Sequence, residues 1–205
     1  MNTNNKSADD FELTKDFTVA DYRKLEATRN TKEIATFIRR RFVGRYLNPL
    51  LNVPQEAKSG FCTMAICCLM IEAVESFRQG WEDSKDKSKQ AFGSFFDRFD
   101  AFAPLRGHAD DFYTSVRCGI LHQAETTNGW RIRREKNMPI FESAAHTIGA
   151  NAFLDALRLS FEEYCKELDA AEWESDVWVK ARIKLNAICN NCFHDPSQKK
   201  KQKGP

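Results

Sequence analysis

The segment from Gly60 to Gln79 is apolar around most of a helical circumference. Its apolar residues recur at helical spacing and extend from one face onto the next: Phe61, Met64, Ala65, Ile66, Cys68, Leu69 and Met70. So wide an apolar surface needs cover on several sides, which predicts a central helix with Gly80 as its natural stop. The charged sequence EDSKDKSKQ that follows predicts a solvent-facing loop or a short exposed helix.

Other segments with helical periodicity flank this one. A helix is expected from about Thr31, and it should stop before Pro49. Further helices are expected at about 108–121, 151–168 and 174–189. A short segment ending at Pro104 is crowded with aromatic residues at helical spacing, which predicts core packing: Phe92, Phe95, Phe96, Phe99 and Phe102. Together these patterns predict an all-α, up-and-down helical bundle.

One stretch departs from helical periodicity. Asn128 and Gly129 form a turn dipeptide, and Trp130, Ile132 and Arg134 then alternate with Arg131 and Arg133. Ile140 and Phe141 lie on a possible returning arm. The pattern predicts a small β-hairpin insertion around residues 126–142.

The length and composition predict one globular domain. The chain has 205 residues, of which 42% are hydrophobic and 29% are charged, and this balance favours a folded core. Residues 1–18 are polar and are expected to be flexible. Residues 19–195 are expected to form the domain, and residues 196–205, with the sequence SQKKKQKGP at their end, a basic disordered tail.

The lack of a recognisable targeting signal and the pattern of cysteines favour a location in the cytoplasm. The start, MNTNNKSADD, lacks the pattern of a signal peptide, and no later stretch reaches the roughly 18 apolar residues that a membrane span needs. The chain has seven cysteines, and Cys67 and Cys68 lie within an apolar run, where free thiols behave as small hydrophobic groups. We therefore expect a cytoplasmic protein in a reducing environment, without a membrane partner.

The net charge of +2 provides no overall field toward nucleic acid, so any basic surface must come from local clusters. One cluster contains Arg39, Arg40 and Arg41, with Arg45 one turn later. The other contains Arg131, Arg133 and Arg134. Each is either a solvated face or a surface for an anionic partner.

The segment DFYTSVRCGILHQAE offers the clearest chemistry. Arg117 is permanently cationic and suits phosphate oxygens, whereas His122 titrates near neutrality and can transfer a proton. Five helical steps turn the direction by about 140°, so the two side chains meet at one anion only if the helix loosens, for which Gly119 is the expected place. The alternative is that Arg117 pairs with a carboxylate such as Glu72 or Glu75 and that His122 merely ends a helix.

At these residues the chain resembles a known family. The run FYTSVRCGILHQ is similar to the signature of HEPN domains, small helical bundles marked by an arginine followed four to six residues later by a histidine. Arg117 and His122 have the version with four intervening residues. The aromatic segment and the central helix ending IEAVESF extend the resemblance to roughly residues 31–168.

The resemblance implies a homodimer that brings two such motifs into a shared cleft. Many members are metal-independent endoribonucleases in toxin–antitoxin, phage-defence and RNA-processing systems. Arg117 would then hold the scissile phosphate of RNA and His122 would act as the acid or base, giving a 2′,3′-cyclic phosphate and a 5′-hydroxyl. No metal or other cofactor is expected, and an antitoxin or regulatory protein is a further expected partner. Cys118 departs from the polar residue that follows the arginine in many active members.

Several residues are expected to support this site. Glu72 and Glu75 on the central helix are candidates to orient Arg117 or His122, and Tyr113 lies one turn before Arg117. Arg131, Arg133 and Arg134 are candidates to bind the RNA backbone. The structural alternatives are an interhelical ion pair, a packing tyrosine and a solvated face.

Two other functions remain open. The first is a catalytically inactive HEPN-like module that binds RNA, nucleotide or a protein partner. The second is a metal-binding module that uses Cys189, Cys192 and His194, although no spacing selects Cys165 or His146 to complete a zinc site. The chain lacks a glycine-rich phosphate loop and a serine nucleophile elbow, which disfavours those enzyme classes.

Overall fold

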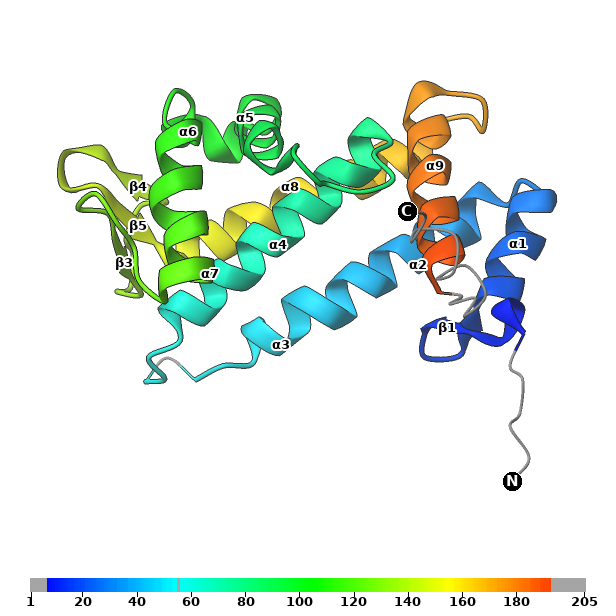
Figure 1. The fold of residues 1–205 in the computed structure, drawn as a ribbon, viewed down its shortest axis with the longest axis horizontal. Coiled ribbons are helices and arrows are strands. Elements are labelled where there is room, and N and C mark those ends of the chain that lie inside the picture. Colours follow the sequence, from blue (N-terminus) through cyan, green and yellow to red (C-terminus); the bar gives the residue numbers. More distant parts are fainter. Residues whose placement is uncertain (1–6, 55, 193–205) are drawn as a thin grey trace, which may run out of the picture.

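The computed structural model describes residues 7–54 and 56–192, which form a mainly helical molecule. Figure 1 shows the helix α4 (Gly60–Gln79) running through its middle. This helix packs against α5 (Ser88–Arg98), α8 (Ala150–Ala170) and α9 (Asp176–Asn191). The predicted mainly α architecture is therefore confirmed.

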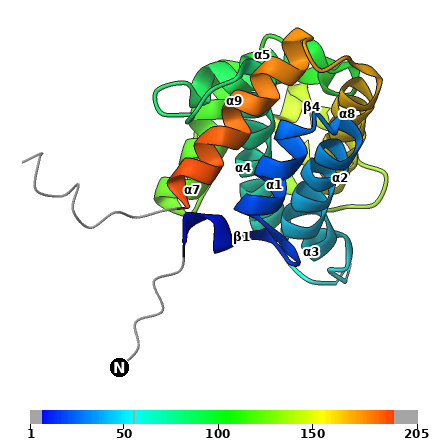
Figure 2. The same ribbon diagram turned by 90° about the vertical axis from the view of Figure 1, so that its right-hand side faces the viewer.

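The remaining helices are shorter than α4. They are α1 (Val19–Ala27), α2 (Thr31–Phe42), α3 (Asn48–Leu51), α6 (Ala109–Phe112) and α7 (Gly119–Gln123), with π-helical turns at Val43–Leu47 and Tyr113–Cys118 and 3₁₀ turns at Ala8–Asp10, Asp100–Leu105 and Ser143–Ala145. Figure 2 views the bundle from the end where α9 lies beside α1. There Asn186 Nδ2 donates a hydrogen bond to Glu26 Oε1 at 3.0 Å.

The prediction for the central helix is confirmed at both ends, and Gly80 caps it with a left-handed φ of 69°. The expectation that no segment has the length of a membrane span is wrong, because α4 is long and apolar enough to cross one. However, 61% of its most apolar window is buried within the protein, as in the core helix of a soluble bundle.

The aromatic core is also confirmed. All five phenylalanines predicted from the segment before Pro104 are buried. Phe96 stacks on Phe102 with ring centroids 5.3 Å apart, and Phe112 stacks on Phe153 at 5.5 Å. These contacts join the segments around α5 and α6 to α8, and thereby fix the helix that carries Arg117.

The β-hairpin prediction needs correction. Strands β3 (Arg131–Arg133), β4 (Phe141–Glu142) and β5 (Thr147–Gly149) form a sheet in the order β3-β5-β4. The returning arm does not pair with β3; instead β5 lies between them, parallel to β3 and antiparallel to β4. Ile148 on β5 is fully buried, so packing of this third strand on the core favours the central position.

Part of the segment expected to be flexible is folded. Strands β1 (Glu12–Thr14) and β2 (Phe17–Thr18) pair, and Leu13 is buried in the core. Helix α1 follows, and it begins at a capping box formed by Thr18 and Asp21. Its apolar periodicity is weak, which explains why the sequence pattern missed it. Residues 1–6 and the predicted tail at 196–205 lie outside the described residues.

The prediction that the helix from Thr31 stops before Pro49 is wrong, because the chain keeps helical geometry through this residue. After α2 it passes through the π-helical turn Val43–Leu47 and continues into α3, where Pro49 is in the first turn. Proline fits a first turn because its missing N–H needs no partner there.

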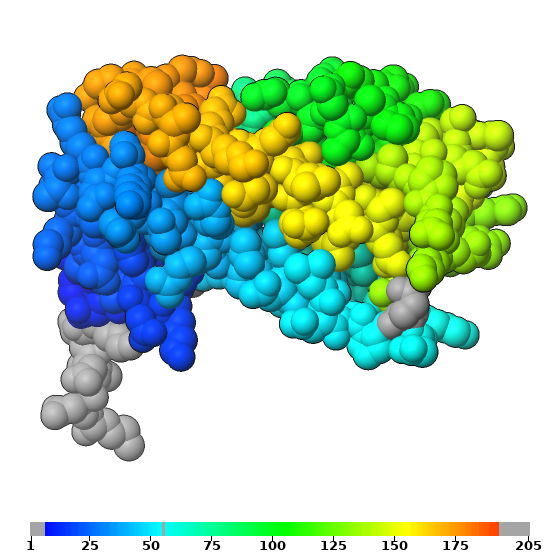
Figure 3. All heavy atoms as spheres, turned by 180° about the vertical axis from the view of Figure 1, so that it is seen from behind, coloured from blue at the N-terminus to red at the C-terminus, as the bar shows by residue number. Residues whose placement is uncertain are grey.

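Figure 3, from behind, shows α8 crossing between the N-terminal hairpin at one end of the molecule and the three-stranded sheet at the other.

Candidate functional site

The helix that carries Arg117 and His122 contains an irregular turn. Residues 109–123 run continuously through α6, the π-helical turn Tyr113–Cys118 and α7. Turns of this type are rare and often occur at functional sites. The widened turn ends before Gly119, which begins a regular α-helix, so the expected loosening at Gly119 is replaced by loosening one turn earlier.

Gly119 has a different role from the one expected. A Cβ atom at this position would lie 2.5 Å from the carbonyl oxygen of Glu125. The loop after α7 folds back along the helix, and Thr127 N donates a hydrogen bond to Ser115 O at 2.9 Å. Gly119 therefore permits close approach of this loop to the helix.

Arg117 makes the central contact of the site. Its Nε donates a hydrogen bond to Glu72 Oε1 on α4 at 2.8 Å, and the side chains of Arg117 and Glu72 are only 16% and 9% exposed. Ser88 Oγ, at the start of α5, donates to the other oxygen of Glu72 at 2.6 Å. Glu72 thus joins the motif helix to two other helices and orients the guanidinium group.

Tyr113 and Cys118 complete the surroundings of Arg117. The guanidinium carbon lies 5.5 Å from the centre of the Tyr113 ring, and Nη1 lies 4.0 Å from Cys118 Sγ. Burial opposes the charge of Arg117, but the hydrogen bond and charge of Glu72 outweigh it and raise the pKa of the guanidinium. Burial, followed by a hydrogen bond with Cys118, raises the pKa of Tyr113. Arg117 therefore stays cationic and Tyr113 stays a neutral phenol.

Glu75 does not join this site. Its carboxylate is fully buried, pairs with Arg78, and accepts a hydrogen bond from Gln79 Nε2 at 3.3 Å. Burial raises the pKa of Glu75, although the charge of Arg78 opposes that effect. Of the two candidate glutamates, only Glu72 contacts Arg117.

His122 lies on a different side of the helix from the Arg117–Glu72 pair. It is exposed on α7 and makes no hydrogen bond or ion pair with any residue that the structure describes. Arg117 and Cys118 lie in the widened turn and residues 119–122 in the regular helix α7, so the five steps from Arg117 to His122 turn the direction by roughly 100–140°. The two motif side chains therefore do not converge within a single subunit.

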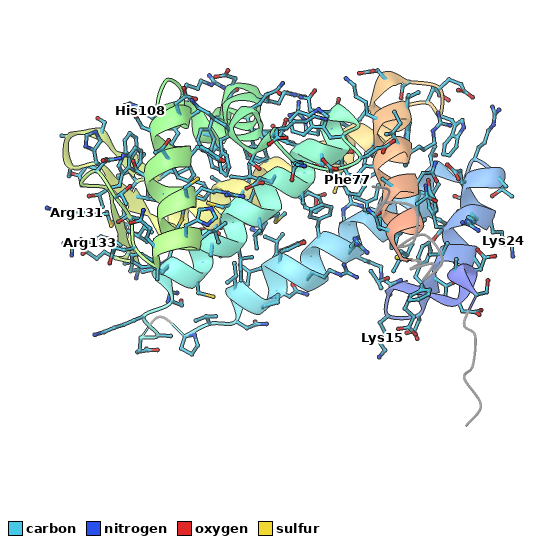
Figure 4. The ribbon with its side chains drawn as sticks, in the orientation of Figure 1. Lys15, Lys24, Phe77, His108, Arg131 and Arg133 are labelled. Atoms are coloured by element: carbon cyan, nitrogen blue, oxygen red, sulfur yellow. The ribbon has the colours of Figure 1, made fainter. Side chains whose placement is uncertain are left out.

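The second arginine cluster divides into two roles. Figure 4 shows Arg131 and Arg133 projecting outward from β3, and both are exposed. Arg133 pairs with Glu135 at 3.2 Å. In contrast, Arg134 Nη1 donates to Ala57 O at 2.6 Å and to Ser59 Oγ at 2.8 Å, so it holds the loop before α4.

Ser88 was not predicted from the sequence as a residue of the site. It lies within EDSKDKSKQ, which was expected to face solvent, but it begins α5 and bonds to Glu72. No local pattern marks this residue, because its partner lies on another helix. Leu121, in the apolar end of the motif helix that was expected to contribute to a dimer contact, retains 38% exposure next to His122.

The cysteine-rich segment near the end of α9 shows no metal site within residues 7–54 and 56–192, where no three histidine, cysteine or acidic side chains gather. Cys189 is buried, and its burial, with the nearby Cys192, raises its pKa to about 11. His194 lies outside the described residues.

Comparison with known proteins adds no relative. The chain matches no family model, no curated protein sequence and no solved structure. The functional interpretation therefore depends on the motif residues and on the geometry described above.

Proposed function

We propose that this protein is a metal-independent endoribonuclease of the HEPN type. The observation that carries the proposal is the position of Arg117: it lies in a π-helical turn, is oriented through Nε by Glu72 at 2.8 Å, and precedes an exposed imidazole on the same helix. A planar cation held through Nε presents its terminal nitrogens to a second anion. Such a cation beside an imidazole is sufficient for cleavage of RNA without metal.

The chemistry follows from these two groups. His122 takes the proton from the ribose 2′-hydroxyl, and O2′ then attacks the adjacent phosphorus. Arg117 stabilises the negative charge that builds on the non-bridging oxygens. The P–O5′ bond breaks as O5′ receives a proton from an imidazolium group. The products are a 2′,3′-cyclic phosphate and a 5′-hydroxyl, and no water molecule is consumed.

We propose that the complete site forms between two subunits. Within one subunit Arg117 faces Glu72 on α4 whereas His122 faces solvent, so His122 of the partner subunit would complete the site around Arg117. Leu121 on α7 and Leu69 on α4 are 38% and 46% exposed, and α4 packs against α7. Exposed apolar residues beside the motif suit a two-fold contact.

The adjoining surface suits an RNA strand. A cavity of about 270 Å³ extends from the loop after α7 along β3, and it is lined by Phe61, Glu125, Thr126, Trp130, Arg131, Ile132 and Arg133. Phe61 is 36% exposed at this surface. Arginines contact phosphates and exposed aromatic rings stack on unpaired bases, so this combination favours single-stranded RNA.

The second candidate is a catalytically inactive HEPN-like module that binds RNA, nucleotide or a protein partner such as an antitoxin. The observation that favours it is the charge balance at the motif, because Glu72 already neutralises Arg117. Cys118 next to Arg117 also favours the inactive module, because many active HEPN members have a polar residue at this position.

Cleavage of end-labelled single-stranded RNA in EDTA tests the proposal. We expect the wild type to cut and both His122→Ala and Arg117→Ala to lose cleavage. His108→Asn is the matched control, because His108 is a partly exposed histidine at the start of α6 whose ring packs edge-on against Phe141, outside the lining of the RNA cavity. A wild type that binds RNA without cutting it would select the inactive module, and cleavage that survives His122→Ala would contradict the assigned chemistry.

Mixing the two inactive variants tests the shared site. In a random dimer of Arg117→Ala and His122→Ala subunits, half of the dimers are mixed, and each has one intact site of two. About a quarter of wild-type cleavage should therefore return. If the site formed within one subunit, every site would carry a lesion and the mixture would stay inactive.

A further inference from the structure

The first arginine cluster forms a separate basic site at the other end of the molecule. Arg40 and Arg41 come from the end of α2, and Arg45 comes from the π-helical turn that follows it. Lys15 joins them from the turn between β1 and β2. Figure 4 shows Lys15 at the end of the molecule opposite Arg131 and Arg133.

Arg39 does not belong to this group. It points toward α8 and forms ion pairs with Glu162 at 3.3 Å and with Asp169 at 2.9 Å. Its neighbours have no such partners: none of Arg40, Arg41 and Arg45 forms an ion pair with any described residue. Arg39 is therefore held in an ion-pair network and is not part of a solvated face. The positive charges of Arg40, Arg41 and Arg45 are not balanced by a described carboxylate.

The four cations surround a cavity of about 320 Å³. Its lining consists of Thr14, Lys15, Arg40, Arg41, Gly44 and Arg45, and it contains no carboxylate. Asp16, the nearest acidic residue along the chain, is not part of the lining. Gly44 leaves room, because no heavy atom lies within 4 Å of the place where its Cβ would be.

Two of the guanidinium groups converge on one neutral atom. Arg41 Nη1 and Arg45 Nη2 donate to the backbone carbonyl of Leu13 at 2.6 Å and 2.5 Å. Leu13 is buried in the core, so this carbonyl is held in place. Burial, and then the charge of Arg45, lower the pKa of Arg41. The fold thus holds the guanidinium groups of Arg41 and Arg45 close together although they repel each other. A bound anion would reduce this repulsion.

We propose that this cavity binds the di- or triphosphate group of a small ligand. A phosphate monoester carries about −1.5 to −2 charges, so four cations match a ligand with at least two phosphates. The arginine forks and the Thr14 hydroxyl provide donors for several phosphate oxygens. The lining has no aromatic ring, so recognition is of the phosphates and the rest of the ligand extends into solvent.

This site is independent of the proposed ribonuclease site, and tripolyphosphate is the probe that tests it. Titration calorimetry with the full chain should show saturable binding that weakens as salt is added. The double variant Lys15→Gln with Arg40→Gln should weaken binding by about tenfold or more, since each charged hydrogen bond contributes substantially. Both residues are exposed, so the variant should keep its helicity.

The matched control removes one arginine and one lysine elsewhere. Arg158 and Lys166 are exposed on α8, and Arg158→Gln with Lys166→Gln should leave the affinity for tripolyphosphate unchanged. Absence of binding by the wild type would overturn the proposal. Equal weakening in both double variants would do the same, because it would indicate a general charge effect. Loss of RNA binding without any tripolyphosphate binding would assign the cluster to a nucleic-acid surface instead.

Discussion

Glu72 accepts a hydrogen bond from Arg117 Nε at 2.8 Å across 45 residues of sequence. This contact joins the middle of the central helix to the π-helical turn that carries the motif. Because Ser88 donates to the other oxygen of Glu72, the carboxylate has little freedom to turn. The guanidinium is thereby oriented by contacts within the fold.

The Glu72–Arg117 pair should contribute to stability more than a surface pair does. A double-mutant cycle with Glu72→Gln and Arg117→Gln is expected to give a coupling energy of about 1–3 kcal/mol, since both groups are largely buried. The measurement is urea unfolding followed by circular dichroism. Lys89 and Asp110 provide the control: their 2.8 Å pair is exposed, so its coupling should stay below about 1 kcal/mol. Equal couplings for the two pairs would refute the assigned role of Glu72.

Gly119→Ala should destabilise the fold because the new methyl group meets backbone rather than a flexible side chain. The Cβ would lie 2.5 Å from Glu125 O, and a loss of about 1–3 kcal/mol in the free energy of unfolding is expected. Gly93, on α5, has no heavy atom within 4 Å of its Cβ position. Gly93→Ala should therefore gain about 0.5–1 kcal/mol. Chemical denaturation of both variants shows whether the free energy of unfolding falls in Gly119→Ala and rises in Gly93→Ala.

Stability should depend on the protonation of Glu75. Burial raises the pKa of this carboxyl above its ordinary value of 4.5, so the folded state binds the proton more tightly than the unfolded state. Its contribution to stability is therefore present below 4.5 and is lost as pH rises through the folded-state pKa. Relative to Glu75→Gln, the wild type should lose stability as pH rises above about 4.5, as measured by urea unfolding.

Asp21 provides the control of opposite sign for that experiment. Hydrogen bonds from Thr18 lower the pKa of Asp21 below its ordinary value of 3.8. Its contribution is therefore present above 3.8 and is lost as pH falls. Relative to Asp21→Asn, the wild type should lose stability on acidification. If the free energies of unfolding of the wild type and Glu75→Gln differed by the same amount at every pH, the raised pKa of the buried Glu75 would be contradicted.

Arg134 and Arg131 should respond differently to loss of charge. Arg134→Gln removes donors to Ala57 O and Ser59 Oγ, so it should lower the free energy of unfolding by about 1–3 kcal/mol. Arg131→Gln changes an exposed side chain and should stay within about 0.5 kcal/mol of the wild type. Filter binding of single-stranded RNA should weaken in Arg131→Gln. A stable Arg134→Gln protein with weakened RNA binding would reverse these assignments.

The amino-acid sequence alone determined the long central helix and most of the core. Apolar spacing is a local property of the chain, and it located α4 from Gly60 to Gln79 and the phenylalanines before Pro104. It also marked Arg117 and His122 as a chemically complementary pair. It missed α1, whose only buried residues are Val19 and Tyr22, because so short an apolar pattern carries little periodicity.

Only the tertiary structure decided which side chains meet. Glu72 and Glu75 lie on the same helix, yet the packing of the motif helix and α5 brings only Glu72 to Arg117. Packing likewise inserts β5 between β3 and β4 and separates Arg39 from the arginines beside it. These outcomes depend on contacts between residues distant in sequence, whose relative rotation and depth no local spacing specifies.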